Sequence, residues 1–179
     1  MPERLFIGVP LSDDARRAIQ KSLPGNLPGK PVTAENWHFT LRFLGSTAPE
    51  ARDQVVHCLE TATCGAPFTI RFSELGAFPQ PKRARILWLG VDQGAERLIQ
   101  LAAIAEAAAR IAGFAAEAKE FKPHLTLSRI DPPSSVAGLI AGKPRFDAVM
   151  TVDSIILYRS RLGAGPARYE EVVRIALGR

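Results

Sequence analysis

The sequence has few cysteines, few histidines and no long apolar run, and each shortage excludes a class of protein. Its 179 residues include 2 Cys, and Cys58 and Cys64 are too far apart for a C-x-x-C redox or zinc motif. No apolar segment approaches the roughly 20 residues of a membrane helix, and the first residues lack a secretory pattern. We therefore expect a cytoplasmic protein without membrane association, built as one domain over residues 1–179.

Nucleotide-loop and metal motifs are also missing. No G-x-x-x-x-G-K-[ST] loop is present, which argues against an energy-dependent reaction. The 3 His residues form no cluster and no H-x-x-x-H pair, so the pattern does not favour a three-histidine metal site. We expect no cofactor and no metal. What the chain does have is basic charge, since 23 Lys and Arg against 18 Asp and Glu give a net charge of +5, and this favours a polyanionic partner.

Hydrophobic alternation and capping residues predict a chain of mixed strands and helices. Strands are predicted at 4–9, 38–44, 68–72, 85–91, 123–130, one or two within 146–158, and 169–177. Helices are predicted at 12–22, capped by Ser12, at 47–63, capped by Thr47, and at 95–112, with a short helical turn after a break at 131–133. This order indicates an α+β or α/β fold, and strand-helix-strand units in each half indicate two related lobes.

Two of the three histidines lie in the same tetrapeptide pattern, HFTL at 38–41 and HLTL at 124–127. In a strand, side chains i and i+2 point to the same face. The polar faces are therefore predicted to carry His38, Thr40 and Arg42 in one strand, and His124, Thr126 and Ser128 in the other. The opposite, core-facing sides are predicted to carry Phe39, Leu41 and Phe43, and Leu125 and Leu127. Unpartnered buried polar groups cost about 1–3 kcal/mol each, so both polar faces are expected to line one solvent-filled cleft.

Paired histidines suit the opening of a phosphodiester. In-line displacement needs a base at the attacking water and an acid at the leaving oxygen. Imidazole, with an ordinary pKa of about 6.5, does either task near neutral pH. The threonine hydroxyls of the motifs can donate to the non-bridging oxygens. The near-symmetry of the two motifs leaves open which histidine is the acid.

The segments RLFIGVPL, NWHFTLRFLG, GAFPQPKRARILWLGV, FKPHLTLSRI and YRSRLGAGPARYEEV together resemble the two-histidine (2H) phosphoesterase superfamily. The closest resemblance is to its RNA 2′,3′-cyclic phosphodiesterase branch, the bacterial 2′-5′ RNA ligase-like proteins. It implies a bilobal α+β fold, with two antiparallel-sheet lobes in pseudo-twofold symmetry around a central cleft and helices outside. It also implies metal-independent hydrolysis of a terminal 2′,3′-cyclic phosphate to a 2′-phosphate, with RNA as the partner, and we expect the chain to act as a monomer.

The resemblance further implies roles for the motif residues. His38 is expected to be the proton donor and His124 the proton acceptor, with Thr40 and Thr126 binding the phosphate. Arg129 is a further candidate phosphate ligand, although alternation puts it on the face opposite His124 unless a β-bulge re-aims it.

Several alternatives stay open at this level. The same site is also compatible with a 2′-5′ RNA ligase or phosphodiesterase, with another cyclic nucleotide phosphodiesterase, or with an RNA-binding module that only contacts phosphate. His57 is expected to be a surface residue of a helix. Lys82, Arg83 and Arg85 form either an RNA-gripping lip or a solvated loop, with Phe78 or Trp37 as a base-stacking surface in the first case.

Overall fold

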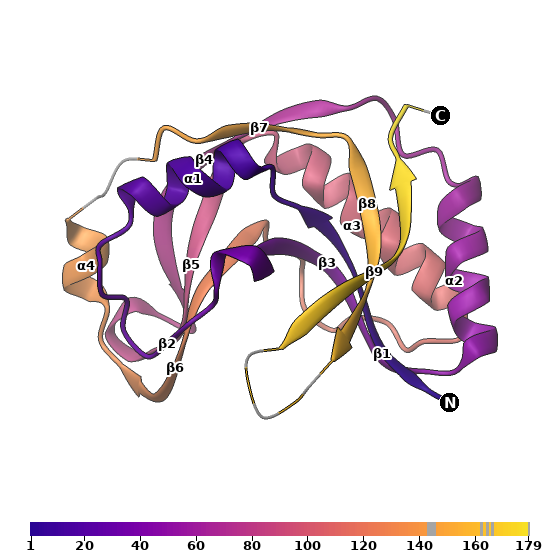
Figure 1. Cartoon of the computed structure of the whole chain (residues 1–179), viewed down its shortest axis with the longest axis horizontal. Coiled ribbons are helices and arrows are strands. Elements are labelled where there is room, and N and C mark those ends of the chain that lie inside the picture. The colour runs from indigo at the N-terminus through magenta and orange to yellow at the C-terminus, as the bar shows by residue number, and fades with distance from the viewer. Residues whose placement is uncertain (143–145, 162, 164, 166, 179) are drawn as a thin grey trace.

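Two antiparallel sheets form the centre of the structure, a computed structural model that describes residues 1–142, 146–161, 163, 165 and 167–178 (Figure 1). One sheet has the strand order β3-β1-β8-β9 and the other β2-β6-β5-β4-β7. The strands are β1 (Glu3–Pro10), β2 (Lys30–Pro31), β3 (His38–Thr47), β4 (Phe68–Phe78), β5 (Ala84–Gln93), β6 (His124–Ser134), β7 (Val149–Val152), β8 (Ser154–Arg161) and β9 (Arg168–Ala176). The α-helices are α1 (Asp13–Ser22), α2 (Pro49–Thr61), α3 (Ala95–Ile111) and α4 (Ala137–Ala141), and 3-10 turns occupy Ala34–Asn36 and Pro81–Arg83.

Helix α1 begins as its sequence predicts, whereas α2 does not. The Ser12 hydroxyl accepts a hydrogen bond from the Ala15 amide at 3.2 Å, which satisfies a free donor of the first turn. Thr47, the predicted cap of α2, instead ends β3, where it is buried and donates to the Gly45 carbonyl at 3.1 Å. Helix α2 starts at Pro49, whose fixed φ suits the first turn without a side-chain cap.

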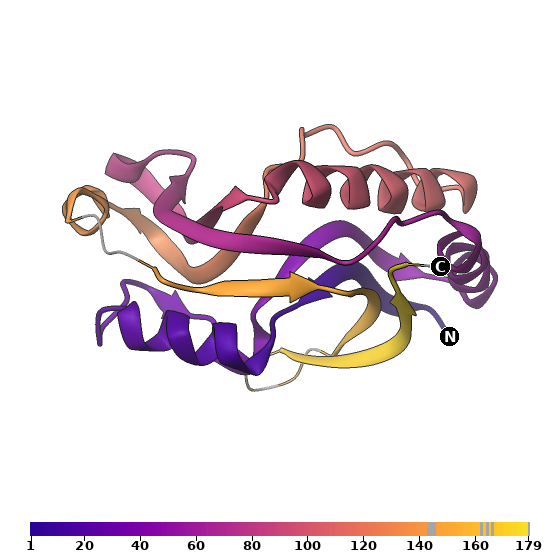
Figure 2. The ribbon, with the colours of Figure 1, turned by 90° about the horizontal axis from the view of Figure 1, so that it is seen from above.

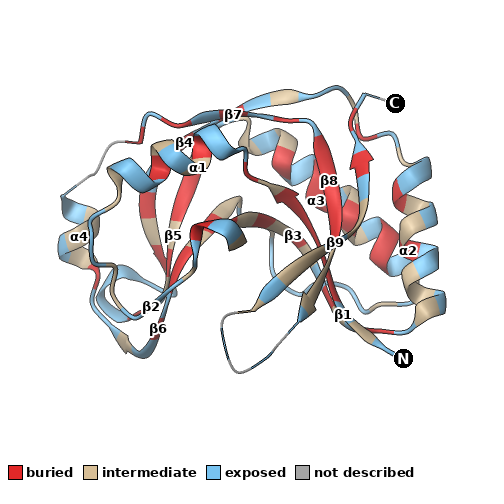
Figure 3. Cartoon of the chain, in the orientation of Figure 1, coloured by how far each residue is buried: buried red, intermediate tan, exposed pale blue. Residues whose placement is uncertain are grey.

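Helices α1 and α3 each pack against a strand of the sheet to which the strand before the helix does not belong. Helix α1 follows β1 but contacts β7, and α3 follows β5 but contacts β3. Figure 2 shows α3 along one side of the strands and α1 along the opposite side. Buried residues concentrate on the strands and on the inward sides of these helices (Figure 3). The apolar core is therefore continuous between both sheets and their helices.

Strands β4 and β6 run several residues further than predicted, β2 was missed, and one open choice is resolved. Strand β4, predicted at 68–72, ends at Phe78. Strand β6 continues through the two prolines of 131–133 to Ser134, because that end pairs with β5 on one side only. The short β2 lies in a segment predicted as loop, and the region 146–158 contains two strands, β7 and β8. In the described part of the chain, no helix is long and apolar enough to cross a membrane.

Candidate active site

Both motif histidines stand at the first position of a strand, and the two strands belong to different sheets. His38 opens β3, at the edge of the four-stranded sheet, and His124 opens β6 in the five-stranded sheet. Each strand pairs antiparallel with the strand that precedes the intervening helix, β3 with β1 and β6 with β5. Strands β3 and β6 also contact each other. The two copies of the motif therefore meet where the sheets adjoin.

His38 is held in one tautomer by its backbone. Its Nδ1 lies 2.7 Å from the Asn36 carbonyl and its Nε2 lies 2.9 Å from the Thr40 hydroxyl. Because a carbonyl only accepts, Nδ1 carries the proton, and the neutral ring accepts the Thr40 hydroxyl at Nε2. The rings of Phe6 and Tyr169 lie 4.7 and 5.1 Å from the imidazole. Because the backbone engages Nδ1, Nε2 is the ring nitrogen that faces a side-chain partner.

His124 repeats this arrangement with a more open surround. Its Nδ1 donates to the Lys122 carbonyl at 2.6 Å, two residues before it, as Asn36 is two residues before His38. The Phe78 ring meets its imidazole edge-on at 5.1 Å, and the Trp88 ring lies at 6.3 Å. Its Nε2 has no hydrogen-bond partner within the residues that the structure describes. Both histidines thus present Nε2 for chemistry.

Burial lowers the pKa of both histidines. For His38 the pKa falls from 6.5 to about 4, because desolvation outweighs the Asn36 carbonyl and the positive charges of Arg129 and His124 add to the effect. Desolvation and the charge of Arg129 also lower the pKa of His124, against the effect of the Lys122 carbonyl. Burial thus favours the neutral form of both rings in the ligand-free site, whereas a bound anion would favour their protonation.

A β-bulge interrupts each motif strand three residues after its histidine. Thr40 and Arg42 pair with consecutive residues of β1, so Leu41 is the extra residue, and Thr126 and Ser128 pair with consecutive residues of β5, so Leu127 is extra. A bulge shifts the alternation of the side chains that follow it by one position, up to the next irregularity of the pairing. The shift turns the fifth residue after each histidine, Phe43 in β3 and Arg129 in β6, toward the cleft.

Two adjoining clefts meet at the motifs. The smaller, of about 360 Å³, is lined by His38, Thr40, Thr126 and Arg129, together with Arg4, Asn36 and Tyr169 among others. The larger, of about 1120 Å³, is lined by His124 and by a mostly apolar wall that includes Phe78, Ile99 and Phe121. Thr40 and Phe43 line both clefts. All five predicted site residues therefore face this pair of clefts.

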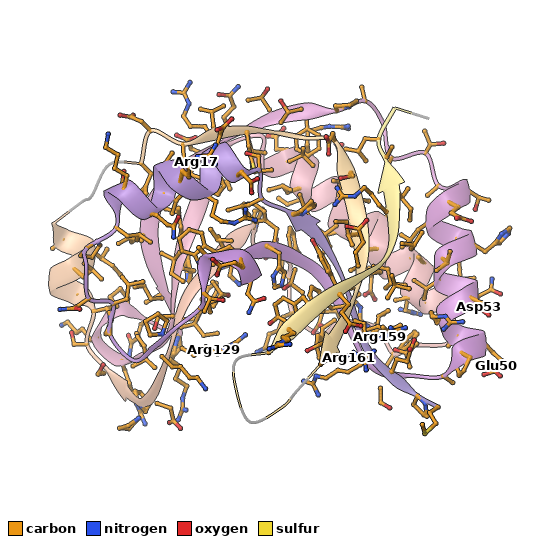
Figure 4. All side chains as sticks on the ribbon, viewed as in Figure 1. Arg17, Glu50, Asp53, Arg129, Arg159 and Arg161 are labelled. Carbon is orange, nitrogen blue, oxygen red and sulfur yellow. The ribbon has the colours of Figure 1, made fainter. Side chains whose placement is uncertain are left out.

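The bulges also explain which residues the alternation misplaced. Ser128 was predicted on the polar face but is buried, with its hydroxyl donating to the Pro28 carbonyl at 2.5 Å. Phe43 was predicted in the core but is 42% exposed, beneath the Arg4 guanidinium at 4.8 Å. Arg129 reaches the cleft because the bulge re-aims it. In Figure 4 its side chain leaves β6 on the side of the β8–β9 hairpin.

Arg42 lines the larger cleft and links β3 to α3 and to the segment that follows α3. Its guanidinium pairs with Glu106 of α3 at 2.5 Å and donates to the Ala115 carbonyl at 2.5 Å. Glu106 also accepts from the Glu117 amide at 3.1 Å. The segment that precedes His124 is therefore tied both to α3 and to the strand of the first motif.

The remaining residues that the sequence suggested for RNA contact fall into two groups, those that line a cleft and those that do not. Trp37 is 5% exposed and donates to the Val32 carbonyl at 3.1 Å, so it is a core residue and offers no stacking surface. Phe78 and Arg85 line the larger cleft, whereas Lys82 and Arg83 lie exposed in a 3-10 turn outside it. His57 is exposed on α2. Among the described residues, no group of three or more His, Cys, Asp or Glu is arranged to hold a metal ion.

Comparison with known proteins places this site in a family. The family model of the 2′-5′ RNA ligase superfamily matches residues 11–164. The chain belongs to this superfamily. Members similar to it include the RNA 2′,3′-cyclic phosphodiesterase of Escherichia coli, 32% identical over 98% of this chain and 97% of that protein. The enzyme of the same name from Aquifex aeolicus is 36% identical over 71% of this chain and 70% of its own length.

Solved structures of the superfamily share the whole fold. E. coli LigT in complex with 3′-AMP superimposes with a TM-score of 0.85 and 30% identity, over 100% of both chains. A crystal structure described as a phosphoesterase gives 0.83 and 29%, also over 100% of both chains. These matches confirm the 2H phosphoesterase family and the bilobal α+β fold that the motif segments predict.

Proposed function

We propose that this chain hydrolyses the 2′,3′-cyclic phosphate at the end of an RNA and leaves a 2′-phosphate. The observation that carries the proposal is the pair of histidines, each with Nδ1 engaged by a backbone carbonyl and Nε2 left for proton transfer. The relatives named RNA 2′,3′-cyclic phosphodiesterase support this substrate. The LigT complex with 3′-AMP supports a site for a phosphate on a ribose.

In the proposed reaction, His124 Nε2 takes a proton from water as the water oxygen bonds to phosphorus. The P–O3′ bond breaks, and His38 delivers a proton from Nε2 to O3′. Thr40, Thr126 and Arg129 bind the non-bridging oxygens and stabilise their developing charge. The negative phosphate raises the pKa of His38, so that Nε2 gains a proton, and the Thr40 hydroxyl turns from Nε2 to the phosphate. Every role belongs to a side chain, so we propose that the reaction needs no metal.

The test is a short RNA with a terminal 2′,3′-cyclic phosphate, incubated in excess EDTA and followed by phosphorus NMR. Wild type is expected to form the 2′-phosphate, and His38→Ala and His124→Ala are each expected to slow it by at least about a hundredfold. His57→Ala, the third histidine, is the matched control and keeps wild-type activity. Tight, salt-sensitive binding without turnover would replace hydrolysis with an RNA-binding function, and activity lost only with EDTA would overturn the metal-free mechanism.

A sulfur substitution assigns the acid and the base. In a cyclic substrate whose bridging 3′ oxygen is replaced by sulfur, the leaving thiolate departs without a proton. His38→Ala is then expected to recover most of its rate, whereas His124→Ala stays slow. Recovery in His124→Ala alone would reverse the two roles.

The larger cleft favours a second candidate activity on the same site. Its volume of about 1120 Å³ beside His124 far exceeds the room that an attacking water needs. An RNA 5′-hydroxyl in this place would attack the same phosphorus and form a 2′-5′ linkage, as the superfamily name describes. Adding 5′-hydroxyl RNA to the assay and analysing the products for a 2′-5′ linkage tests this candidate.

We further propose that the protein works in the cytoplasm as a monomer and that residues 1–179 form one domain. Both clefts are lined by residues of both sheets from a single chain, and Cys58 and Cys64 are free thiols, which suits a reducing compartment. A sedimentation measurement at micromolar concentration is expected to give the mass of one chain.

A further inference from the structure

Two cations stand side by side next to the smaller cleft. Lys30 of β2 and Arg129 of β6 are direct partners in the antiparallel pairing, and both are exposed. Within the described part of the chain, neither forms an ion pair with a carboxylate. Other arginines do form such pairs, for example Arg159 and Arg161 with Glu170. Like charges directly opposite on neighbouring strands destabilise a sheet. An anion bound between them would remove this repulsion.

The segment that carries Lys30 is fixed firmly against β6. The buried Ser128 hydroxyl donates to the Pro28 carbonyl, and the Val32 amide donates to the Leu127 carbonyl at 2.8 Å. Gly29 adopts φ +76°, and a Cβ at this position would lie 2.4 Å from the Arg129 carbonyl oxygen. Only glycine permits so close an approach. The position of Lys30 beside Arg129 is therefore built into the backbone.

Arg129 connects Lys30 to the reactive groups. It lines the smaller cleft with His38 and Thr126, and its charge lowers the pKa of both histidines. Lys30 is its neighbour on the edge strand β2 and is not among the residues that line the cleft. A phosphodiester bound between Lys30 and Arg129 thus lies outside the reacting centre, next to the cyclic phosphate that Arg129 also contacts.

We propose that Lys30, together with Arg129, forms a subsite for the phosphodiester that joins the terminal nucleotide to the rest of the RNA. The proposal rests on the function proposed above and adds that the enzyme recognises a chain rather than a cyclic mononucleotide. Fixed cations recognise a backbone phosphate without reading its base, so the preference extends to any sequence.

Three substrates isolate this subsite: adenosine 2′,3′-cyclic phosphate, the dinucleotide ApA with a terminal cyclic phosphate, and the same dinucleotide with a neutral methylphosphonate linkage. For wild type, kcat/KM is expected to be about tenfold higher for the charged dinucleotide than for the other two. Lys30→Gln removes most of this preference and leaves the mononucleotide rate unchanged. Lys21→Gln, which removes an exposed lysine of α1, is the matched control.

Equal effects of Lys30→Gln on all three substrates, or no effect on any, would overturn the subsite while the proposed function stands. If wild type hydrolyses none of them, the proposed function fails, and the subsite is judged by binding alone. Lys30→Gln must then weaken the binding of ApA 2′-phosphate about tenfold, with no change for its methylphosphonate analogue. If wild type and Lys30→Gln bind ApA 2′-phosphate with the same affinity, the subsite is rejected independently of turnover.

Discussion

At the scale of the residue, the carbonyl two positions before each histidine decides which ring nitrogen is engaged by the backbone. Asn36 and Lys122 accept from Nδ1 at 2.7 and 2.6 Å, so the two imidazoles have equivalent orientations although they come from different sheets. Their surroundings differ, since His38 also receives the Thr40 hydroxyl and is enclosed by more aromatic rings. The two chemically identical side chains are thereby given different proton affinities.

The maximum of kcat/KM is expected at a lower pH than the maximum of kcat. The profile of kcat/KM reports the free enzyme, in which burial lowers the pKa of His38 to about 4 and that of His124 below 6.5. One ring must be protonated and the other neutral, so kcat/KM peaks below pH 6.5 and falls as the pH rises. In the complex the phosphate anion raises both pKa values and moves the kcat profile upward. Superimposed profiles would contradict this account of the electrostatics.

Tyr169→Ala is expected to raise the pKa of His38. The Tyr169 ring lies 5.1 Å from the imidazole and lines the smaller cleft. Its removal admits water, which weakens the desolvation that is the main cause of the low pKa, and the value rises from about 4 by about one pH unit or more. Tyr169→Phe keeps the ring and serves as the control, with the imidazole proton signals followed by NMR during a pH titration. An unchanged titration in Tyr169→Ala would show that the other rings alone desolvate His38.

The sequence predicts well which motif side chains share a face of each strand, because their spacing is short and periodic. His38 and Thr40, like His124 and Thr126, share a face through strand alternation alone, and no bulge lies between them. Beyond the bulges the same rule gave the wrong face for Ser128 and Phe43. The leucines at 41 and 127 do not themselves indicate a bulge. The bulge is set by the register with the partner strand, which the sequence of the motif strand does not contain.

At the scale of the element, Gly29→Ala is expected to loosen the β2 segment from β6. The new Cβ would meet the Arg129 carbonyl, and alanine disfavours the φ of +76°. We expect a loss of about 1–3 kcal/mol in the free energy of unfolding, measured by chemical denaturation, together with a higher KM for RNA. Gly25→Ala is the control, since a Cβ there has nothing within 4 Å. Equal stabilities of the two variants would mean that the segment shifts without strain.

Element boundaries were predictable where a local hydrogen bond sets them and were missed where pairing decides. Ser12 caps α1 through its own hydroxyl, and the prediction of that helix is confirmed. Thr47 has the same capping chemistry but serves β3, because its strand continues to pair with β1 up to that residue. The two-residue strand β2 is likewise a product of its partner β6 and not of its own Lys-Pro sequence.

At the scale of the whole molecule, both sheets are expected to unfold in one transition. Helix α3 follows a strand of one sheet and packs on the other, and α1 does the reverse. The chain has 2 Trp, so a Trp37→Phe variant leaves Trp88 of β5 as the fluorescent reporter of the five-stranded sheet. Its denaturation midpoint is expected to coincide with that of the far-ultraviolet circular dichroism of the whole chain. Separate midpoints would contradict the single-domain proposal.

The matched bulges place two unlike side chains at equivalent positions of the smaller cleft. Phe43 and Arg129 occupy equivalent places, five residues after equivalent histidines, yet one offers a π surface and the other a cation. The two halves of the site therefore differ in charge at these positions, in addition to the differences in cleft size and in the rings around each histidine. One backbone device thus presents an aromatic surface from one sheet and a cation from the other, so a fold with near-symmetric strands offers an asymmetric surface to its ligand.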